Sequence, residues 1–135
     1  MKKGALVNVI LLVLSILLCA GVKFAFHACA PKDDGSWMLC HWAEQVVFSV
    51  GAVFSLLSLA RFFLKDSKIK AGISISFVPL SILVAFIPNT LIPLCMMKEM
   101  RCHTVMRPSV LVLCVLLAAV SVIDSIVLLK SEKKK

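Results

Sequence analysis

The chain has 135 residues, of which 61% are hydrophobic, and its mean hydropathy is +1.02. This composition excludes an ordinary soluble domain, which carries far more polar residues. The net charge of +8 is unevenly placed along the chain, so nucleic acid is not an expected partner. The expected environment is a lipid bilayer.

Four apolar runs are each long enough to cross a bilayer, which takes roughly 20 helical residues. They cover residues 5–26, 43–64, 71–92 and 109–129. So little chain remains between them that we expect one membrane domain over residues 1–135. The predicted fold class is an all-α membrane protein, a four-transmembrane-helix bundle.

The first run follows Lys2 and Lys3, as the apolar core of a signal peptide would, and Ala28-Cys29-Ala30 resembles a cleavage site. The run is longer than that of a usual signal peptide, and Pro31 would follow the cut. We therefore predict that the first span is retained. Within it, Asn8 is expected to hydrogen-bond to a neighbouring helix.

The basic residues gather on one side of the predicted spans: Lys2, Lys3, Arg61, Lys65, Lys68, Lys70, Lys130 and residues 133–135. On the other side, the fewer cations are offset by acids. This asymmetry follows the positive-inside rule and predicts that both termini are cytoplasmic. The basic side chains would then lie near anionic headgroups.

The third span contains Pro79 and is followed by Pro88 and Pro93, so we expect residues 87–93 to unwind. The predicted outer loops cover residues 27–42 and 93–108. Each carries a cysteine and then a Cys-His pair: Cys29 with Cys40-His41, and Cys95 with Cys102-His103. This parallel favours two tandem hairpin repeats in the same orientation.

Cysteines outside the cytoplasm form stable disulfides. Of the three possible pairings of the four loop cysteines, we favour Cys29–Cys40 and Cys95–Cys102, because each closes a local loop. Each bridge would contribute roughly 2–4 kcal/mol. The free thiols would then be Cys19 and Cys114.

A second interpretation is thiol–disulfide exchange. Four spans with two outward cysteine pairs resemble, in architecture only, the quinone-coupled disulfide-generating membrane oxidases, and a quinone would then be the cofactor. Neither loop has the Cys-x-x-Cys spacing that lowers a thiol pKa. The sequence carries no other catalytic motif. We therefore favour a protein that is not an enzyme and predict no resident cofactor.

A third interpretation is a soft-metal site, since thiolates, thioethers and imidazoles favour copper or zinc. The candidate ligands are Cys40, His41, Cys95, Met96, Met100, Cys102 and His103. A cysteine in a disulfide cannot act as a thiolate ligand, so this interpretation and the structural bridges exclude each other.

Four further residues are candidates for function: Trp42, Glu44, Gln45 and Asp124. Trp42 suits a membrane–water boundary. Glu44 shares a helix face with Cys40, and Gln45 with His41; we expect Glu44 to stabilise the helix N-terminus or to orient a histidine. Asp124 is the only acid well inside a span, so it is expected to face the interior or to reach a basic partner at the cytoplasmic end.

Two motifs now support a comparison: Cys29…Asp34-Gly35…Met38-x-Cys40-His41-Trp42-Ala43-x-Gln45, and Cys95-Met96-x3-Met100-x-Cys102-x6-Ser109. With them, essentially the whole chain resembles an uncharacterised bacterial family of small four-span membrane proteins that is known as a domain of unknown function. The resemblance implies a multi-pass protein of the bacterial cytoplasmic membrane. It also implies an ABC-type transporter as a partner, because genes of such proteins often lie beside transporter permeases and ATPases.

The favoured function is a non-enzymatic accessory subunit of a larger, transporter-type membrane complex, with disulfide-stiffened outer loops. A membrane thiol–disulfide oxidoreductase and a copper- or zinc-binding membrane protein are the two alternatives. Assembly into a homo-oligomer is left open.

Overall fold

The structure is a computed structural model that describes residues 2–25, 30–88, 90–93, 96–99 and 102–134. Its helices are α1 (Lys2–Ala20), α2 (Leu39–Phe63), α3 (Ser67–Phe86) and α4 (Arg107–Lys133), with π-helical turns η1 (Gly21–Ala25) after α1 and η2 (Cys102–Met106) before α4. The described residues contain no strand. All four helices are long and apolar enough to cross a membrane. The prediction of an all-α, four-span bundle is confirmed.

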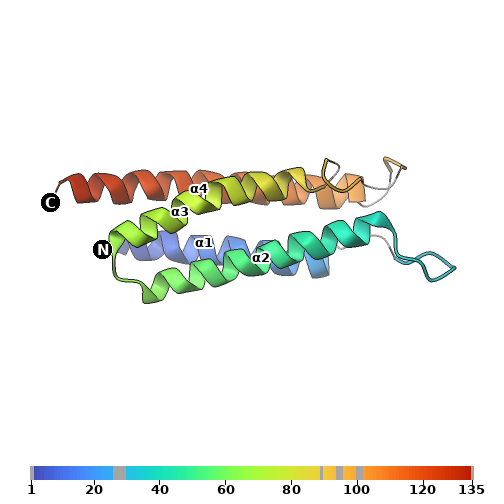
Figure 1. Cartoon of the computed structure of the whole chain (residues 1–135), viewed down its shortest axis with the longest axis horizontal. Helices are drawn as coiled ribbons and strands as arrows, with labels where there is room; N and C mark the ends of the chain where they lie inside the picture. The colour runs from blue at the N-terminus through green and yellow to red at the C-terminus, as the bar shows by residue number, and fades with distance from the viewer. Residues whose placement is uncertain (1, 26–29, 89, 94–95, 100–101, 135) are drawn as a thin grey trace.

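The helices run back and forth, so both termini lie at one end of the bundle (Figure 1). We call this the termini end; the short connection 64–66 between α2 and α3 also lies there. The longer connections, which include residues 30–38, 90–93 and 96–99, lie at the opposite end, the loop end.

Several helix bounds differ from the expected spans. The α2 helix begins at Leu39, so Cys40 and His41 belong to its first turn and not to the loop. The α3 helix covers Ser67–Phe86 in place of 71–92. Its C-cap Ile87 still has helical backbone angles, and the next residue, Pro88, has no backbone N–H with which to continue the helix. The α4 helix tolerates Pro108 in its first turn and continues to Lys133.

The bundle consists of two antiparallel hairpins. Helix α3 packs most extensively on α4, and α1 on α2, whereas α2 and α3 touch over a small area. The hairpins meet chiefly where α1 packs against α4 (Figure 1). Contact between the hairpins is thus narrower than contact within them.

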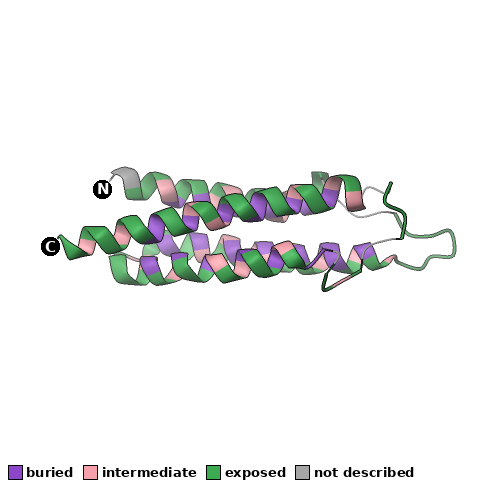
Figure 2. Cartoon of the chain, turned by 90° about the horizontal axis from the view of Figure 1, so that it is seen from above, coloured by how far each residue is buried: buried purple, intermediate pink, exposed green. Residues whose placement is uncertain are grey.

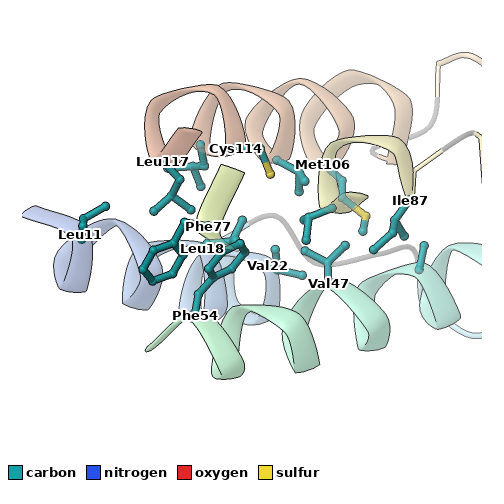
Figure 3. Packing of buried hydrophobic residues seen from close by; sticks show 14 of the residues in the cluster. Leu11, Leu18, Val22, Val47, Phe54, Phe77, Ile87, Met106, Cys114 and Leu117 are labelled. Carbon is teal, nitrogen blue, oxygen red and sulfur yellow. The ribbon is translucent and has the colours of Figure 1, made fainter. Parts of the chain in front are cut away.

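The large apolar residues fall into two groups. Many lie on the outer faces of the helices, where they are exposed and would contact lipid (Figure 2). The others form a buried cluster in which Phe54 and Phe77 stack with ring centroids 5.0 Å apart (Figure 3). Because lipid is as apolar as these side chains, close packing and hydrogen bonds hold such helices together.

One close approach within the first hairpin depends on a missing side chain. A Cβ atom built on Gly51 of α2 would lie 3.0 Å from the Cα atom of Cys19 and 3.2 Å from its nitrogen. These are backbone atoms of α1, so they can move only if the whole helix moves. Gly51 therefore sets the distance between α1 and α2.

Candidate functional site

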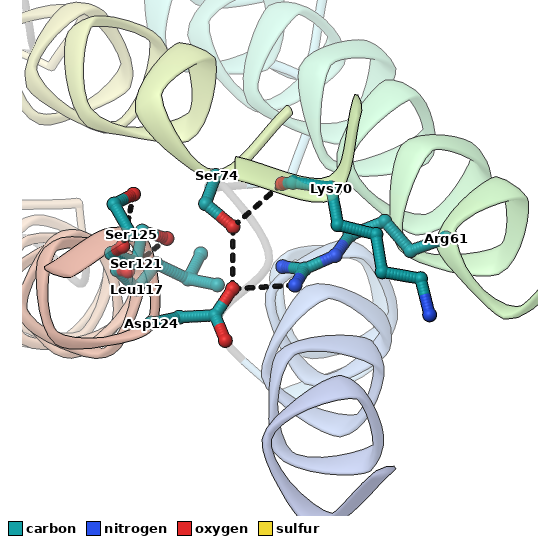
Figure 4. Close-up of polar contacts among 7 residues, drawn as sticks. All are labelled: Arg61, Lys70, Ser74, Leu117, Ser121, Asp124 and Ser125. Atoms are coloured by element: carbon teal, nitrogen blue, oxygen red, sulfur yellow. Dashed lines mark hydrogen bonds and ion pairs between the residues drawn. The ribbon is translucent and has the colours of Figure 1, made fainter. Parts of the chain in front are cut away.

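A charged and hydrogen-bonded group of three residues lies inside the bundle near the termini end (Figure 4). The Arg61 guanidinium donates from Nη2 to Oδ2 of Asp124, and the Ser74 hydroxyl donates to the same oxygen over 2.5 Å. Arg61 belongs to α2, Ser74 to α3 and Asp124 to α4, and the side chains of Arg61 and Asp124 are 1% and 3% exposed. We call these three residues the polar centre. It ties the first hairpin to both helices of the second.

This position of Asp124 accounts for an acid inside a membrane span. A buried carboxylate is tolerated when an opposite charge and further hydrogen bonds compensate for the lost water. Asp124 faces the interior and pairs with a base, and these are the two roles expected for it. The sequence indicates its partner, Arg61, only as one of the basic residues that predict topology, and not as a site residue. Its position seven residues after Phe54 and three after Ser58 could have placed it on the buried face.

Buried serines continue this polar region along the helices. The hydroxyl of Ser15 on α1 lies 3.1 Å from that of Ser58 on α2, and it also donates to the Leu11 carbonyl over 2.7 Å. On α4, Ser121 and Ser125 donate to carbonyls one turn earlier. These serine hydroxyls therefore bond mainly to backbone carbonyls of their own helices and, between Ser15 and Ser58, to each other.

At the loop end, Glu44 and Cys40 lie buried on one face of α2, one turn apart, as their spacing predicts. Glu44 lies 3.6 Å from the ammonium of Lys23, which is partly exposed. The bundle thus holds a second ion pair, between η1 and the first turns of α2.

The aromatic residues of this end surround His41. The ring of Trp37 stacks on His41 with centroids 4.0 Å apart, and Trp42 meets it edge-on at 6.0 Å. Trp42 is exposed, and Gln45 is half-buried with its carbonyl accepting a hydrogen bond from Ser49 over 2.8 Å. Stacking holds the imidazole flat against an indole.

The segment before α2 carries a tight turn. Gly35 has a positive φ of 81°, and its N–H donates to the Lys32 carbonyl over 2.8 Å. The Ser36 hydroxyl donates to Oδ1 of Asp34 over 3.0 Å, and this bond lowers the pKa of the Asp34 carboxyl. Asp34 is therefore an anion at neutral pH.

The predicted cysteine and metal sites fall largely outside the described residues. Cys29, Cys95 and Met100 lie there, and Cys102 is described only by its backbone. Of the other candidate ligands, Met96 is fully exposed and His103 is half-buried. The described free thiols are Cys19 and Cys114, and Cys40 is not one of them. Within the described part of the chain, no three His, Cys, Asp or Glu residues are grouped as a metal site.

These features define a small multi-pass membrane protein with a buried ion pair near the termini end of its bundle and a partly exposed one at the loop end. Residues 11–127 match the model of the family described as "Domain of unknown function (DUF4418)", and the chain belongs to this family. The matched range contains both loops, Arg61 and Asp124. The family resemblance expected from the loop motifs is confirmed. No curated protein and no solved structure matches the chain.

Proposed function

We propose that this protein is a non-enzymatic accessory subunit of a larger membrane complex and that it docks through its loop end. The observation that carries the proposal is the exposure of large apolar side chains on the connections at that end. Met96 is fully exposed, and Trp37, Leu91 and Met97 are each more than half exposed. None of them lies in a helix.

Lipid is a poor cover for this surface, because charged residues alternate with the apolar ones. Lys98 and Glu99 directly follow the two methionines, and the segment before Trp37 exposes Lys32, Asp33 and Asp34. Burying these charges in hydrocarbon would be costly. Protein interfaces, by contrast, combine tryptophan and methionine with a charged rim. Methionine also adapts its flexible side chain to irregular partner surfaces.

The proposal includes the topology and the class of partner. We propose that the termini end faces the cytoplasm of a bacterial cell, because Lys65, Lys68, Lys70 and Lys130 gather there. The partner would then meet the loop end outside the cytoplasmic membrane. An ABC-type transporter is the partner class that the family resemblance implies.

Two disulfides, Cys29–Cys40 and Cys95–Cys102, would stiffen the docking surface and reduce the entropy lost on binding. The burial of Cys40 supports a structural role, since thiol exchange requires access to the sulfur. The same cysteines would serve the two alternative functions, disulfide exchange and soft-metal binding, so their redox state separates the alternatives.

Counting thiols is the first test. We expect two alkylated cysteines when protein purified without chelator or reductant is denatured and alkylated, and six after reduction, as read from intact mass. The two would be Cys19 and Cys114, which are free in the structure. Metal content is measured on the same sample. Six reactive thiols with stoichiometric copper or zinc would contradict the structural bridges and favour the metal site.

Docking is tested by photo-crosslinking in native membranes. A photoreactive residue placed at Met96 should give one discrete protein adduct, identified by mass spectrometry as a membrane protein of the same cell. The same residue at Leu116, which is exposed on the outer face of α4, is the matched control and should label lipid. The adduct should disappear when Met97 is changed to aspartate. Labelling of lipid alone at both positions would overturn the proposal.

A further inference from the structure

The interior of the bundle is divided into a polar half and an apolar half. Most buried polar residues lie between the middle of the bundle and the termini end: Asn8, Ser15, Ser58, Arg61, Ser74, Ser121, Asp124 and Ser125. The half toward the loop end is filled mainly by apolar side chains such as Val22, Val47, Val84 and Val110. The stacked rings of Phe54 and Phe77 lie where the two halves meet, one turn from Ser58 and Ser74 (Figure 3).

The polar half contains buried groups whose hydrogen-bonding capacity is not used. Arg61 contacts Asp124 through Nη2, but its Nε and Nη1 atoms have no hydrogen-bond partner among the described residues. The same is true of Oδ1 of Asn8 and, on the loop-end side of Phe77, of the Ser81 hydroxyl oxygen. Each unpaired buried group of this kind costs about 1–3 kcal/mol, and a charged group costs more.

The serines supply further acceptors. Ser74 and Ser121 donate their single hydroxyl proton inside the bundle, and each oxygen keeps lone pairs that can accept. The region therefore offers unpaired donors on a cation, an unpaired amide acceptor and several hydroxyl acceptors. Water is the small molecule that both donates and accepts, and a buried water typically takes two to four such partners. A small anion fits less well, because Asp124 already neutralises Arg61.

We propose that the polar half of the bundle is a water-binding vestibule that admits water from the termini end and stops at the Phe54–Phe77 pair. Arg61 is its principal donor, and Asn8 and the buried serines are its acceptors. Arg61 lies two residues before the end of α2, so the path from the aqueous side is short. The α4 helix has 27 residues and is roughly 40 Å long, about 10 Å more than the hydrocarbon core, so its last turns reach water.

Water contact at Arg61 can be measured directly, because the chain has three arginines: Arg61, Arg101 and Arg107. The variant R101K/R107K leaves Arg61 as the single arginine. In bilayers, the Arg61 Nε–H signal of uniformly ¹⁵N-labelled protein should receive magnetisation from water in a water-edited solid-state NMR experiment. The exposed indole of Trp37 is the positive control, and the buried backbone amide of Val84 is the negative control.

Two substitutions then test the assigned acceptors. Changing Asn8 to leucine should slow the transfer from water to Arg61, because one acceptor of the vestibule is lost. Changing Ser81 to alanine removes a buried serine on the loop-end side of Phe77 and should leave the transfer unchanged. The proposal would be overturned if, in R101K/R107K, Arg61 received no more magnetisation from water than Val84 does, while Trp37 received it readily. This outcome does not depend on whether Asn8→Leu folds.

Discussion

Replacing Arg61 with alanine is expected to destabilise the folded bundle by about 3–5 kcal/mol, the usual cost of removing one partner of a buried ion pair. The side chain of Asp124 is 3% exposed, and without Arg61 its charge would be compensated by the Ser74 hydroxyl alone. Equilibrium unfolding in detergent micelles measures the change in free energy.

The matched control removes both charges. Changing Arg61 and Asp124 to leucine together should be far less harmful than R61A alone, since no buried charge is then left unpaired. Ser74→Ala should cost about 1 kcal/mol, because it removes one hydrogen bond and keeps the ion pair. If R61A behaved like Lys65→Ala, an exposed cation at the same end, the ion pair would have no role in stability.

Replacing Gly51 is the second change with a large expected effect. An alanine Cβ would meet the backbone of Cys19 at 3.0 Å, and we expect a loss of about 1–3 kcal/mol, as for other overpacked sites. Leucine should separate α1 from α2 altogether. Disulfide trapping between cysteines introduced at Ser15 and Ser58, whose hydroxyls lie 3.1 Å apart, would report that separation by losing efficiency.

Gly72 provides the comparison for Gly51. It also lies inside a helix, but a Cβ atom there would meet nothing within 4 Å. Gly72→Ala should therefore stabilise α3 by about 0.5–1 kcal/mol, the helix preference of alanine over glycine. Equal stability of Gly51→Ala and Gly72→Ala, measured by the same unfolding experiment, would show that α1 adjusts without cost.

The number and class of the helices could be predicted because a bilayer imposes one length and one composition on each span. The helix bounds were less predictable, since they depend on local turns. Hydropathy alone extends the third span past Pro88 to residue 92, whereas the backbone leaves the helix at Phe86. Hydropathy also stops the fourth span at residue 129, although lysines continue the helix to Lys133.

The polar centre could be predicted in part. An acid within a span is conspicuous, and Asp124 was selected for that reason. Arg61 lies next to the basic turn between α2 and α3, where the positive-inside rule already explains a cation. Arg61 instead turns inward and pairs with an acid 63 residues later in the chain. This pairing depends on how the two hairpins pack against each other, and no local sequence pattern predicts that packing.

Among the candidate residues at the loop end, contacts within one helix could be predicted, whereas a contact across the start of a helix could not. The shared face of Cys40 and Glu44 follows from a spacing of four residues in one helix, and the structure buries both. The stacking of Trp37 on His41 crosses the boundary between connection and helix. Trp37 lies within the predicted outer loop 27–42 and before α2, so helical spacing does not relate it to His41.

The polar centre also constrains how the chain is made. Arg61 leaves the ribosome 63 residues before Asp124, so the first hairpin enters the membrane while its arginine lacks a counterion. Because Arg61 lies two residues from the end of α2, its long side chain can reach the interfacial water until Asp124 has been synthesised. The second hairpin then supplies the acid, and the arginine turns inward. A chain truncated before α4 would lack Asp124 and would leave this arginine without its acid.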